Sequence, residues 1–188
     1  YQISQYKYPL VSGGNISGID LTRIHLEEDT AQSTHDIHEK SLVNFNRAGV
    51  PLMELVTEPV IHDAETAVKF AKELQLLLRY LNAGEANLEK GEMRVEANIS
   101  VSKTEKFGTK TEVKNLNSFK AVEKAIAYEI ERQINALENG EVVIQETRGW
   151  DENTGKTYSQ RLKESSHDYR YFPEPDLPKL KISEIPEF

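Results

Sequence analysis

Three short stretches of this sequence alternate between charged and apolar residues, a period of two that suits a β-strand. Because successive side chains of a strand point to opposite faces, each stretch predicts one polar and one apolar face. A solvated face needs only Thr, Ser and Lys, but these faces carry carboxylates beside Arg, Lys and Asn. The three stretches are His25–Asp29, Met93–Val101 and Lys110–Lys114.

Two longer segments have the apolar period of an amphipathic helix. The first is expected to begin after the N-cap residue Asp63 and to end at Asn82–Gly84. The second is expected to run from the cap Ser118 to Asn139–Gly140. Their apolar positions are Val68, Ala71, Leu74, Leu78 and Leu81 in the first, and Phe119, Val122, Ile126, Ile130, Ile134 and Leu137 in the second.

Further strands are predicted along the rest of the chain, at Leu42–Phe45, Leu52–Thr57, Val142–Arg148 and Thr157–Leu162. The polar segment Thr30–Lys40 is expected to be a loop, and the Pro-rich segment Phe172–Pro178 is expected to run extended. Clusters of strands with two long helices indicate an α+β fold built in layers.

The composition describes a globular chain with room for a sizeable core: 188 residues, 38% of them hydrophobic and 29% charged. No apolar run approaches the length of a membrane span, so no membrane partner is expected. The absence of cysteine excludes disulfides and thiolate zinc sites and fits a reducing cytosol. A net charge of −8 argues against the whole segment gripping a nucleic acid backbone, although it leaves room for local basic patches.

Acids and bases interleaved on separate strands are the groups that a Mg²⁺–phosphate site requires. Mg²⁺ prefers oxygen ligands, and the candidate metal ligands are Glu28, Glu96 and Glu112. Arginine binds phosphate through a bidentate fork and lysine as a point charge. The candidate phosphate- and nucleotide-binding residues are Arg94, Asn98, Lys110 and Lys114. Cross-strand ion pairs on an exposed face explain the same pattern, and spacing alone does not decide between the two interpretations.

The histidines indicate a functional site less clearly than the acids do. On the first charged strand, the period of two aligns Glu27 with His25 and turns Glu28 to the opposite face. The other histidines are expected to be ordinary surface groups: His35, His38, His62 and His167. No Ser-His-Asp arrangement and no cysteine nucleophile is predicted.

Seven unusual motifs occur in order along nearly the whole chain. They are Tyr1–Tyr6 (YQISQY), His25–Asp29 (HLEED), Asn46–Leu52 (NRAGVPL), Thr57–Pro59 (TEP), Lys114–Phe119 (KNLNSF), Gln145–Arg148 (QETR) and Asp168–Asp176 (DYRYFPEPD). Together they resemble the B subunit of the aspartyl/glutamyl-tRNA amidotransferases. Their number and order make this resemblance far more specific than any single motif.

The resemblance implies a fold, an activity and partners. The fold would be a cradle, an antiparallel sheet with flanking helices related to the catalytic fold of glutamine synthetase. The activity would be that of a ligase, which uses ATP and Mg²⁺ to phosphorylate the side-chain carboxylate of mischarged Glu-tRNA(Gln) or Asp-tRNA(Asn). Ammonia released from glutamine by the amidase, or A subunit, would displace the phosphate. A small C subunit would complete a cytoplasmic heterotrimer.

The resemblance also implies roles for individual residues. These are metal binding for Glu28, Glu96 and Glu112, stabilisation of the transferring phosphoryl group for Arg94 and Lys114, and orientation of substrate for Asn115 and Asn117. Members of the family carry Cys-Asp at Val95–Glu96, Gly-Lys at Ala31–Gln32 and Asp at Asn44. This chain therefore keeps the acid at Glu96 and lacks a cation close to the first acidic strand.

The family's Glu-x-His ligand pair and its cysteine zinc knob would lie upstream of Tyr1, and the helical tail that grips tRNA would lie beyond Phe188. Residues 1–188 are accordingly expected to form one cradle domain, truncated at both ends and inactive in isolation. Two alternatives stay open. One is the archaeal B-like subunit, which is restricted to Glu-tRNA(Gln) and pairs with an asparaginase-like partner. The other is a non-catalytic scaffold that docks the amidase.

Overall fold

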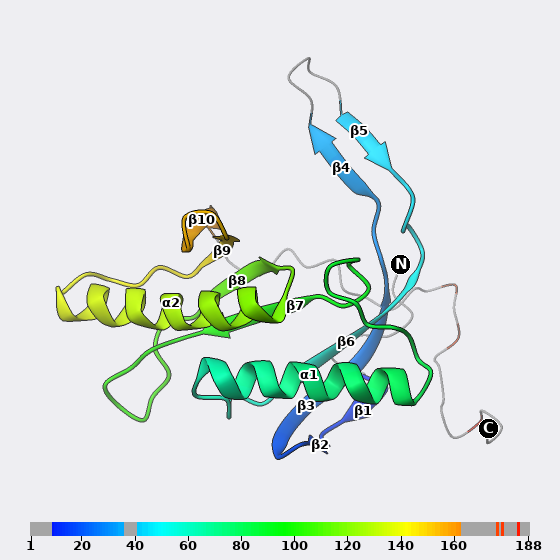
Figure 1. Ribbon diagram of the computed structural model, residues 1–188, viewed down its shortest axis with the longest axis horizontal. Coiled ribbons are helices and arrows are strands. Elements are labelled where there is room, and N and C mark those ends of the chain that lie inside the picture. Colours follow the sequence, from blue (N-terminus) through cyan, green and yellow to red (C-terminus); the bar gives the residue numbers. More distant parts are fainter. Residues whose placement is uncertain (1–8, 36–40, 163–175, 177, 179–183, 185–188) are drawn as a thin grey trace. The chain divides into compact units, whose positions relative to one another are not determined.

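The computed structural model describes residues 9–35, 41–162, 176, 178 and 184 (Figure 1). The described residues form two helices and ten strands with mostly antiparallel pairs, which confirms the α+β prediction. The chain divides into two compact units, residues 1–60 with 169–188 and residues 61–168. The motif Tyr1–Tyr6 and nearly all of the segment 168–178 lie outside the described residues. A single cradle domain and a likeness to glutamine synthetase stay predictions.

The first unit is built on its longest strand, β3, which pairs antiparallel with three others. The four strands of this sheet, β3 included, are β1 (Val11–Ser12), β2 (Asn15–Ile16), β3 (Ile19–Glu28) and β6 (Pro51–Thr57). Directly after β3, the buried carboxylate of Asp29 accepts a 2.7 Å hydrogen bond from Arg47 Nε. This ion pair ties the turn before β6 to the end of β3.

The predicted loop Thr30–Lys40 is wrong in part, because Gln32–His35 forms strand β4. It pairs antiparallel with β5 (Ser41–Asn44), with Ser33 opposite Val43 and Thr34 opposite Leu42. The polar composition of Gln32–His35 favoured a loop. Pairing with β5 overrides that preference, because it satisfies the backbone groups on the facing edges of the two strands.

The second unit is a four-stranded sheet, in the order β10-β9-β8-β7, with two helices. Only the β8–β9 pair is parallel among the described strands of this sheet. The predicted strand Val142–Arg148 begins later, at Glu146. The elements are α1 (Ala64–Tyr80), β7 (Val95–Ile99), β8 (Thr111–Leu116), α2 (Phe119–Glu138), β9 (Glu146–Asp151) and β10 (Lys156–Leu162).

Both predicted helix caps are confirmed. Asp63 Oδ1 accepts a 2.7 Å hydrogen bond from Thr66 N at the start of α1, and Ser118 Oγ accepts one of 3.0 Å from Ala121 N at the start of α2. Each bond satisfies a backbone N–H that has no partner within the helix. Neither helix in the described part of the chain is long and apolar enough to cross a membrane.

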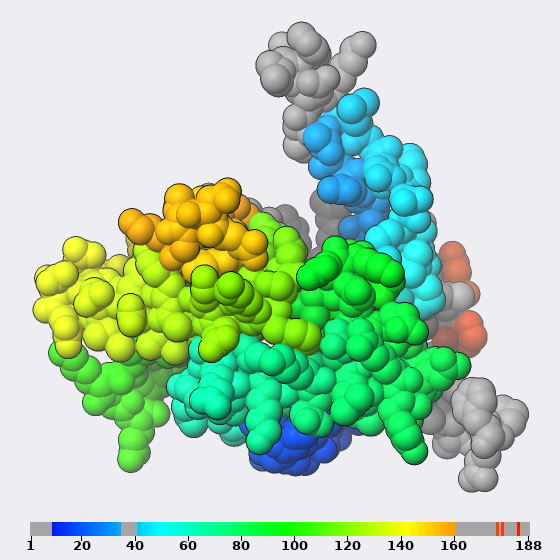
Figure 2. All heavy atoms as spheres, viewed as in Figure 1, coloured from blue at the N-terminus to red at the C-terminus, as the bar shows by residue number. Residues whose placement is uncertain are grey.

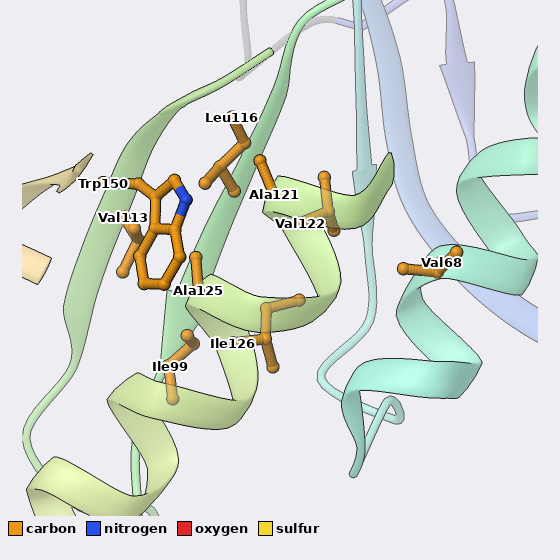
Figure 3. Packing of buried hydrophobic residues seen from close by; sticks show 9 residues of the cluster. All are labelled: Val68, Ile99, Val113, Leu116, Ala121, Val122, Ala125, Ile126 and Trp150. Carbon is orange, nitrogen blue, oxygen red and sulfur yellow. The ribbon is translucent and has the colours of Figure 1, made fainter. Parts of the chain in front are cut away.

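Helix α2 packs on one face of this sheet and forms the core of the second unit (Figure 3). Val122 and Ala125 of the helix are fully buried, as is Val113 of β8. Trp150 of β9 is buried in the same cluster and meets Tyr128 of α2 edge to face, with ring centroids 6.2 Å apart. These contacts hold the apolar face of β8 inside and leave its polar face outward.

The positions of the predicted apolar stripe of α2 are buried or half-buried, with the exception of Ile134. Val122 and Ile126 are buried, but Ile134 is 38% exposed. The fully buried residues in the second half of the helix are Glu129 and Gln133. Gln133 Nε2 donates to Ile99 O over 3.1 Å, and its Oε1 accepts from Val101 N over 3.1 Å. The side-chain amide therefore pairs with the backbone at the end of β7 in the way that a strand would.

Glu129 is the centre of a buried polar network between α2 and the strands β9 and β10. Its carboxylate accepts hydrogen bonds from Arg132 at 2.6 and 2.9 Å, from Gln133 at 3.0 Å and from Thr157 Oγ1 at 2.9 Å. Arg148 Nε lies 3.6 Å away. Burial acts to raise the pKa of Glu129, but these hydrogen bonds and the charge of Arg132 outweigh it and hold the pKa below its ordinary value.

Candidate active site

The outward face of β7 and β8 brings together three of the predicted site residues. On β8, Thr111 and Val113 are buried, so Glu112 and Lys114 share the opposite face, as the period of two predicts. Lys114 Nζ lies 3.1 Å from both carboxylate oxygens of Glu96 on β7 and 3.8 Å from Glu112 Oε1. The ammonium group thus sits between two carboxylates that come from neighbouring strands.

Strand β9, the parallel neighbour of β8, holds the side chain of Glu112 in place. The β8–β9 register pairs Glu112 with Thr147, whose Oγ1 donates a 3.0 Å hydrogen bond to Glu112 Oε2. The side chain of Glu112 is 13% exposed, against 44% for Glu96. Sequence reasoning missed Thr147, although it lies in the motif Gln145–Arg148. The motif was visible in the sequence, but Glu112, the residue that Thr147 contacts, lies 35 positions away.

Asn115 interrupts the alternation of β8 immediately after Lys114. Its φ is +63°, in the left-handed region that Asn tolerates better than most residues. The β7–β8 register shifts between Val95 and Ala97, so Asn115 is the extra residue of a β-bulge. As a result Leu116 returns to the core while Asn115 stays exposed.

Of the remaining predicted residues, Arg94 and Lys110 lie at the margins of this face, whereas Asn98 lies within it, opposite Glu112. The predicted strand Met93–Val101 is too long, since β7 is Val95–Ile99, and exposed Arg94 precedes it. The physical reason is a turn in which Asn87 O accepts from the backbone N–H groups of Glu92 and Met93. Exposed Lys110 likewise precedes β8, whereas exposed Asn98 lies on β7 two residues after Glu96.

The first unit carries a separate cluster of His25, Glu27 and Glu54. His25 and Glu27 lie on one face of β3, and the β3–β6 register places Glu54 opposite His25. His25 Nε2 lies 3.6 Å from Glu27 Oε2 and 3.9 Å from Glu54 Oε2. One nitrogen and two carboxylate oxygens lie within 4.8 Å of one another, a spacing at which they could hold a cation.

The electrostatics of this cluster fit a cation. Burial and the nearby charge of Glu54 raise the pKa of Glu27, against the opposing effect of His25. The His25 side chain is only 5% exposed, and its Nδ1 is buried without a hydrogen-bond partner among the described residues. A divalent ion would relieve the crowding of the two carboxylates. Sequence reasoning did not bring His25 and Glu54 together, because their contact depends on the register of two strands.

Glu28, the third predicted metal ligand, is the last residue of β3 and stands opposite Pro51. It is half-buried and belongs to the first unit, whereas Glu96 and Glu112 belong to the second. Within the second unit, the carboxylates of Glu96 and Glu112 are oxygen donors of the kind that Mg²⁺ prefers, and Lys114 shows that a positive charge fits between them. The role of Glu28 as a metal ligand stays a prediction.

Comparison with known proteins gives a consistent result over the whole chain. The sequence profile of the GatB/GatE catalytic domain matches residues 1–185. The chain is 52% identical to the B subunit of the aspartyl/glutamyl-tRNA(Asn/Gln) amidotransferase of Thermodesulfovibrio yellowstonii, over 98% of this chain and 41% of that protein. It is 48% identical to the B subunit of the same enzyme of Crocosphaera subtropica, over 98% of this chain and 42% of that protein.

The chain thus spans about two fifths of the length of these curated relatives. Within that span it carries the charged strands and the KNLNSF and QETR motifs on described elements. The match of the profile covers nearly every residue, and the identities far exceed what a shared fold alone requires. The chain therefore belongs to the GatB/GatE catalytic domain family.

Proposed function

We propose that this chain is the part of a tRNA-dependent amidotransferase B subunit that activates the side-chain carboxylate of Glu-tRNA(Gln) or Asp-tRNA(Asn). The Glu96–Lys114–Glu112 cluster on the outward face of β7 and β8 is the main support for this proposal. It brings carboxylate oxygens, which could bind a metal ion, and an ammonium group, which could bind phosphate, to one place. Family membership adds weight, because the named relatives are subunits of an aspartyl/glutamyl-tRNA(Asn/Gln) amidotransferase.

The chemistry to be accelerated brings like charges together, since a carboxylate attacks a phosphoryl group. Catalysis of such a step comes mainly from positioning and from neutralising charge. Lys114 and Arg94 would bind phosphoryl oxygens, with Lys110 and Asn98 at the nucleotide. The Asn115 bulge would orient the substrate side chain beside Lys114.

Mg²⁺ would be held by the carboxylates of Glu96 and Glu112, and the family resemblance adds Glu28 as a metal-binding acid. The His25–Glu27–Glu54 cluster is a further place where this chain could hold a divalent ion. ATP would supply the phosphoryl group that makes the carboxylate susceptible to attack by ammonia. The chain's own residues would position the acid and screen the negative charges.

The complete protein would work in the cytoplasm with an amidase that releases ammonia and with a small third subunit. The isolated segment would be inactive, because it spans only part of its relatives. The central experiment is to assemble the full-length protein with its partners and to measure amidation of both mischarged tRNAs. Amidation of neither tRNA would refute the proposal.

Replacing Lys114 with methionine is expected to lower kcat for amidation by about 10²–10³-fold, the usual cost of removing one group that stabilises transition-state charge. Methionine keeps the length of the aliphatic part of lysine, with sulfur in place of one methylene, and lacks the ammonium group. Release of ammonia from glutamine by the amidase should not change. Lys124→Met, at an exposed position of α2, is the matched control. Wild-type kcat for Lys114→Met would show that the lysine serves only as a surface ion pair.

The Glu28→Ala/Glu112→Ala double variant is expected to lose Mg-ATP binding and amidation together, because it removes two of the three expected metal-binding carboxylates. Titration calorimetry of the full-length protein with Mg-ATP measures the first effect. Normal binding together with normal amidation would remove the basis of the metal assignment. Glu131→Ala, an exposed acid of α2, controls for a general loss of negative charge.

Two other functions remain distinguishable. An archaeal-type B-like subunit would amidate Glu-tRNA(Gln) and leave Asp-tRNA(Asn) unchanged, and the matching profile covers GatE as well as GatB domains. A scaffold would bind the amidase but bind no Mg-ATP. Assaying both tRNAs on the assembled enzyme separates the first alternative, and calorimetry on the full-length protein separates the second.

A further inference from the structure

The loop between β7 and β8 is a basic projection on an acidic chain. Residues 102–110 contain three lysines and one glutamate, in a protein with a net charge of −8. Phe107 lies among them and is 73% exposed. Figure 2 shows this green segment standing out from the second unit below α2. The lysines are Lys103, Lys106 and Lys110.

The neck of this loop is closely packed. A Cβ atom on Gly108 would lie 2.1 Å from Val101 O, so only glycine allows the two backbone segments to approach this closely. Val101 N in turn donates to Gln133 of α2, which anchors the neck to the helix. The loop therefore leaves the sheet at a fixed point.

Hydrogen bonds within the loop order its first half. Thr104 N donates to Ser102 Oγ over 3.1 Å, and Lys106 N donates to Thr104 Oγ1 over 3.3 Å. In the part of the chain that the structure describes, no carboxylate pairs with the ammonium groups of the three lysines. Their charges are thus available to a ligand from outside.

Exposed lysines beside an exposed aromatic ring are the two elements of a single-stranded nucleic acid site. The ammonium groups attract phosphates, and the ring stacks on a base without regard to its identity. A protein-docking surface would need a contiguous apolar patch, but the residues that adjoin Phe107 in the sequence are Lys106, Gly108 and Thr109. The loop also leads directly into β8, and Lys110 precedes Lys114 by about 13 Å of extended strand.

We propose that residues 102–110 bind an unpaired stretch of the RNA substrate, next to the carboxylate-activating face of β7 and β8. Lys103 and Lys106 contact phosphates, and the ring of Phe107 stacks on a base. This inference rests on the proposed function, because it assumes a substrate carried by tRNA. It assigns a local RNA contact to a chain whose overall charge is unfavourable for one.

The test is a salt titration of tRNA binding by the full-length protein assembled with its partners. For Lys103→Gln/Lys106→Gln, the slope of log K against log salt concentration should become shallower by about 1.4, or about 0.7 for each lost single-strand phosphate contact. For Phe107→Ala, the affinity should fall about tenfold while the slope stays that of the wild type, because stacking releases no counterions. Lys69→Gln/Lys124→Gln, at exposed positions of α1 and α2, is the matched control.

A wild-type slope for Lys103→Gln/Lys106→Gln, or a wild-type affinity for Phe107→Ala, would overturn the proposal. Loss of binding to a partner protein with unchanged RNA affinity would overturn it in favour of a protein-docking role. The outcome is separable from that of the proposed function. If the wild-type enzyme amidates tRNA and the loop variants bind it normally, only the loop assignment fails. If the wild-type enzyme neither binds nor amidates tRNA, the proposed function itself fails.

Discussion

Replacing Glu129 with alanine is expected to lower the free energy of unfolding by about 3–5 kcal/mol, the cost of breaking a buried ion pair by removing one partner. The carboxylate is fully buried, and its removal leaves Arg132 without its acceptor and Gln133 and Thr157 each short of one. Urea denaturation of the protein measures this change. Glu131→Ala, at an exposed position of the same helix, is expected to change the free energy by no more than about 0.5 kcal/mol.

The same residue predicts the behaviour of the protein in acid. The pKa of Glu129 in the folded protein lies below its ordinary value of 4.5. Its stabilising effect is therefore complete above about pH 4.5 and is lost as the pH falls through the lower, folded-state pKa. Glu129→Gln should lose less stability than the wild type over that acidic range. An identical loss in both proteins would show that the network does not depend on the charge of Glu129.

Replacing Trp150 with alanine is expected to cost about 3–5 kcal/mol of unfolding free energy, because it leaves a large cavity in the core of the second unit. Trp150 is buried against α2 and β8 and packs edge to face on Tyr128. The variant should also reduce amidation, since β9 carries Thr147, which holds the carboxylate of Glu112. Denaturation and kcat measurements check the two effects.

Two further variants serve as controls for the stability loss of Trp150→Ala. Trp150→Phe should retain most of the stability, because the smaller ring fills part of the cavity and keeps the contact with Tyr128. Tyr80→Ala removes an aromatic ring that is 86% exposed and should change the free energy of unfolding by no more than about 0.5 kcal/mol. A loss for Trp150→Ala as small as that for Tyr80→Ala would mean that the cluster contributes little to stability.

Elements that depend on local signals could be predicted from the sequence. Asp63 and Ser118 cap the two helices as expected, because a cap needs only a polar side chain and the three residues after it. The face shared by Glu112 and Lys114 follows from the period of a strand. Strand β4 could not be predicted, because its residues are polar and only its pairing with β5 makes it a strand.

Helix α2 likewise contains positions that the sequence pattern predicts correctly and positions that it does not. Helical spacing identifies Val122 and Ile126 as buried, but it also assigns Ile134 to the core, where the structure exposes it. Glu129 and Gln133 are buried instead, because Thr157, Ile99 and Val101 supply hydrogen bonds from distant parts of the chain. A hydrophobic pattern contains no information about such partners, and so it ranks these two residues as exposed.

The sequence by itself determined the strand and helix periods, the helix caps and, through its ordered motifs, the family of this chain. Only the tertiary structure decided which charged groups meet. His25 faces Glu54, and Thr147 holds Glu112, through strand registers that join residues about thirty positions apart. Register depends on backbone hydrogen bonds and side-chain packing between strands, and no local pattern encodes it. The charged faces could therefore be predicted one strand at a time, but the clusters that they form could not.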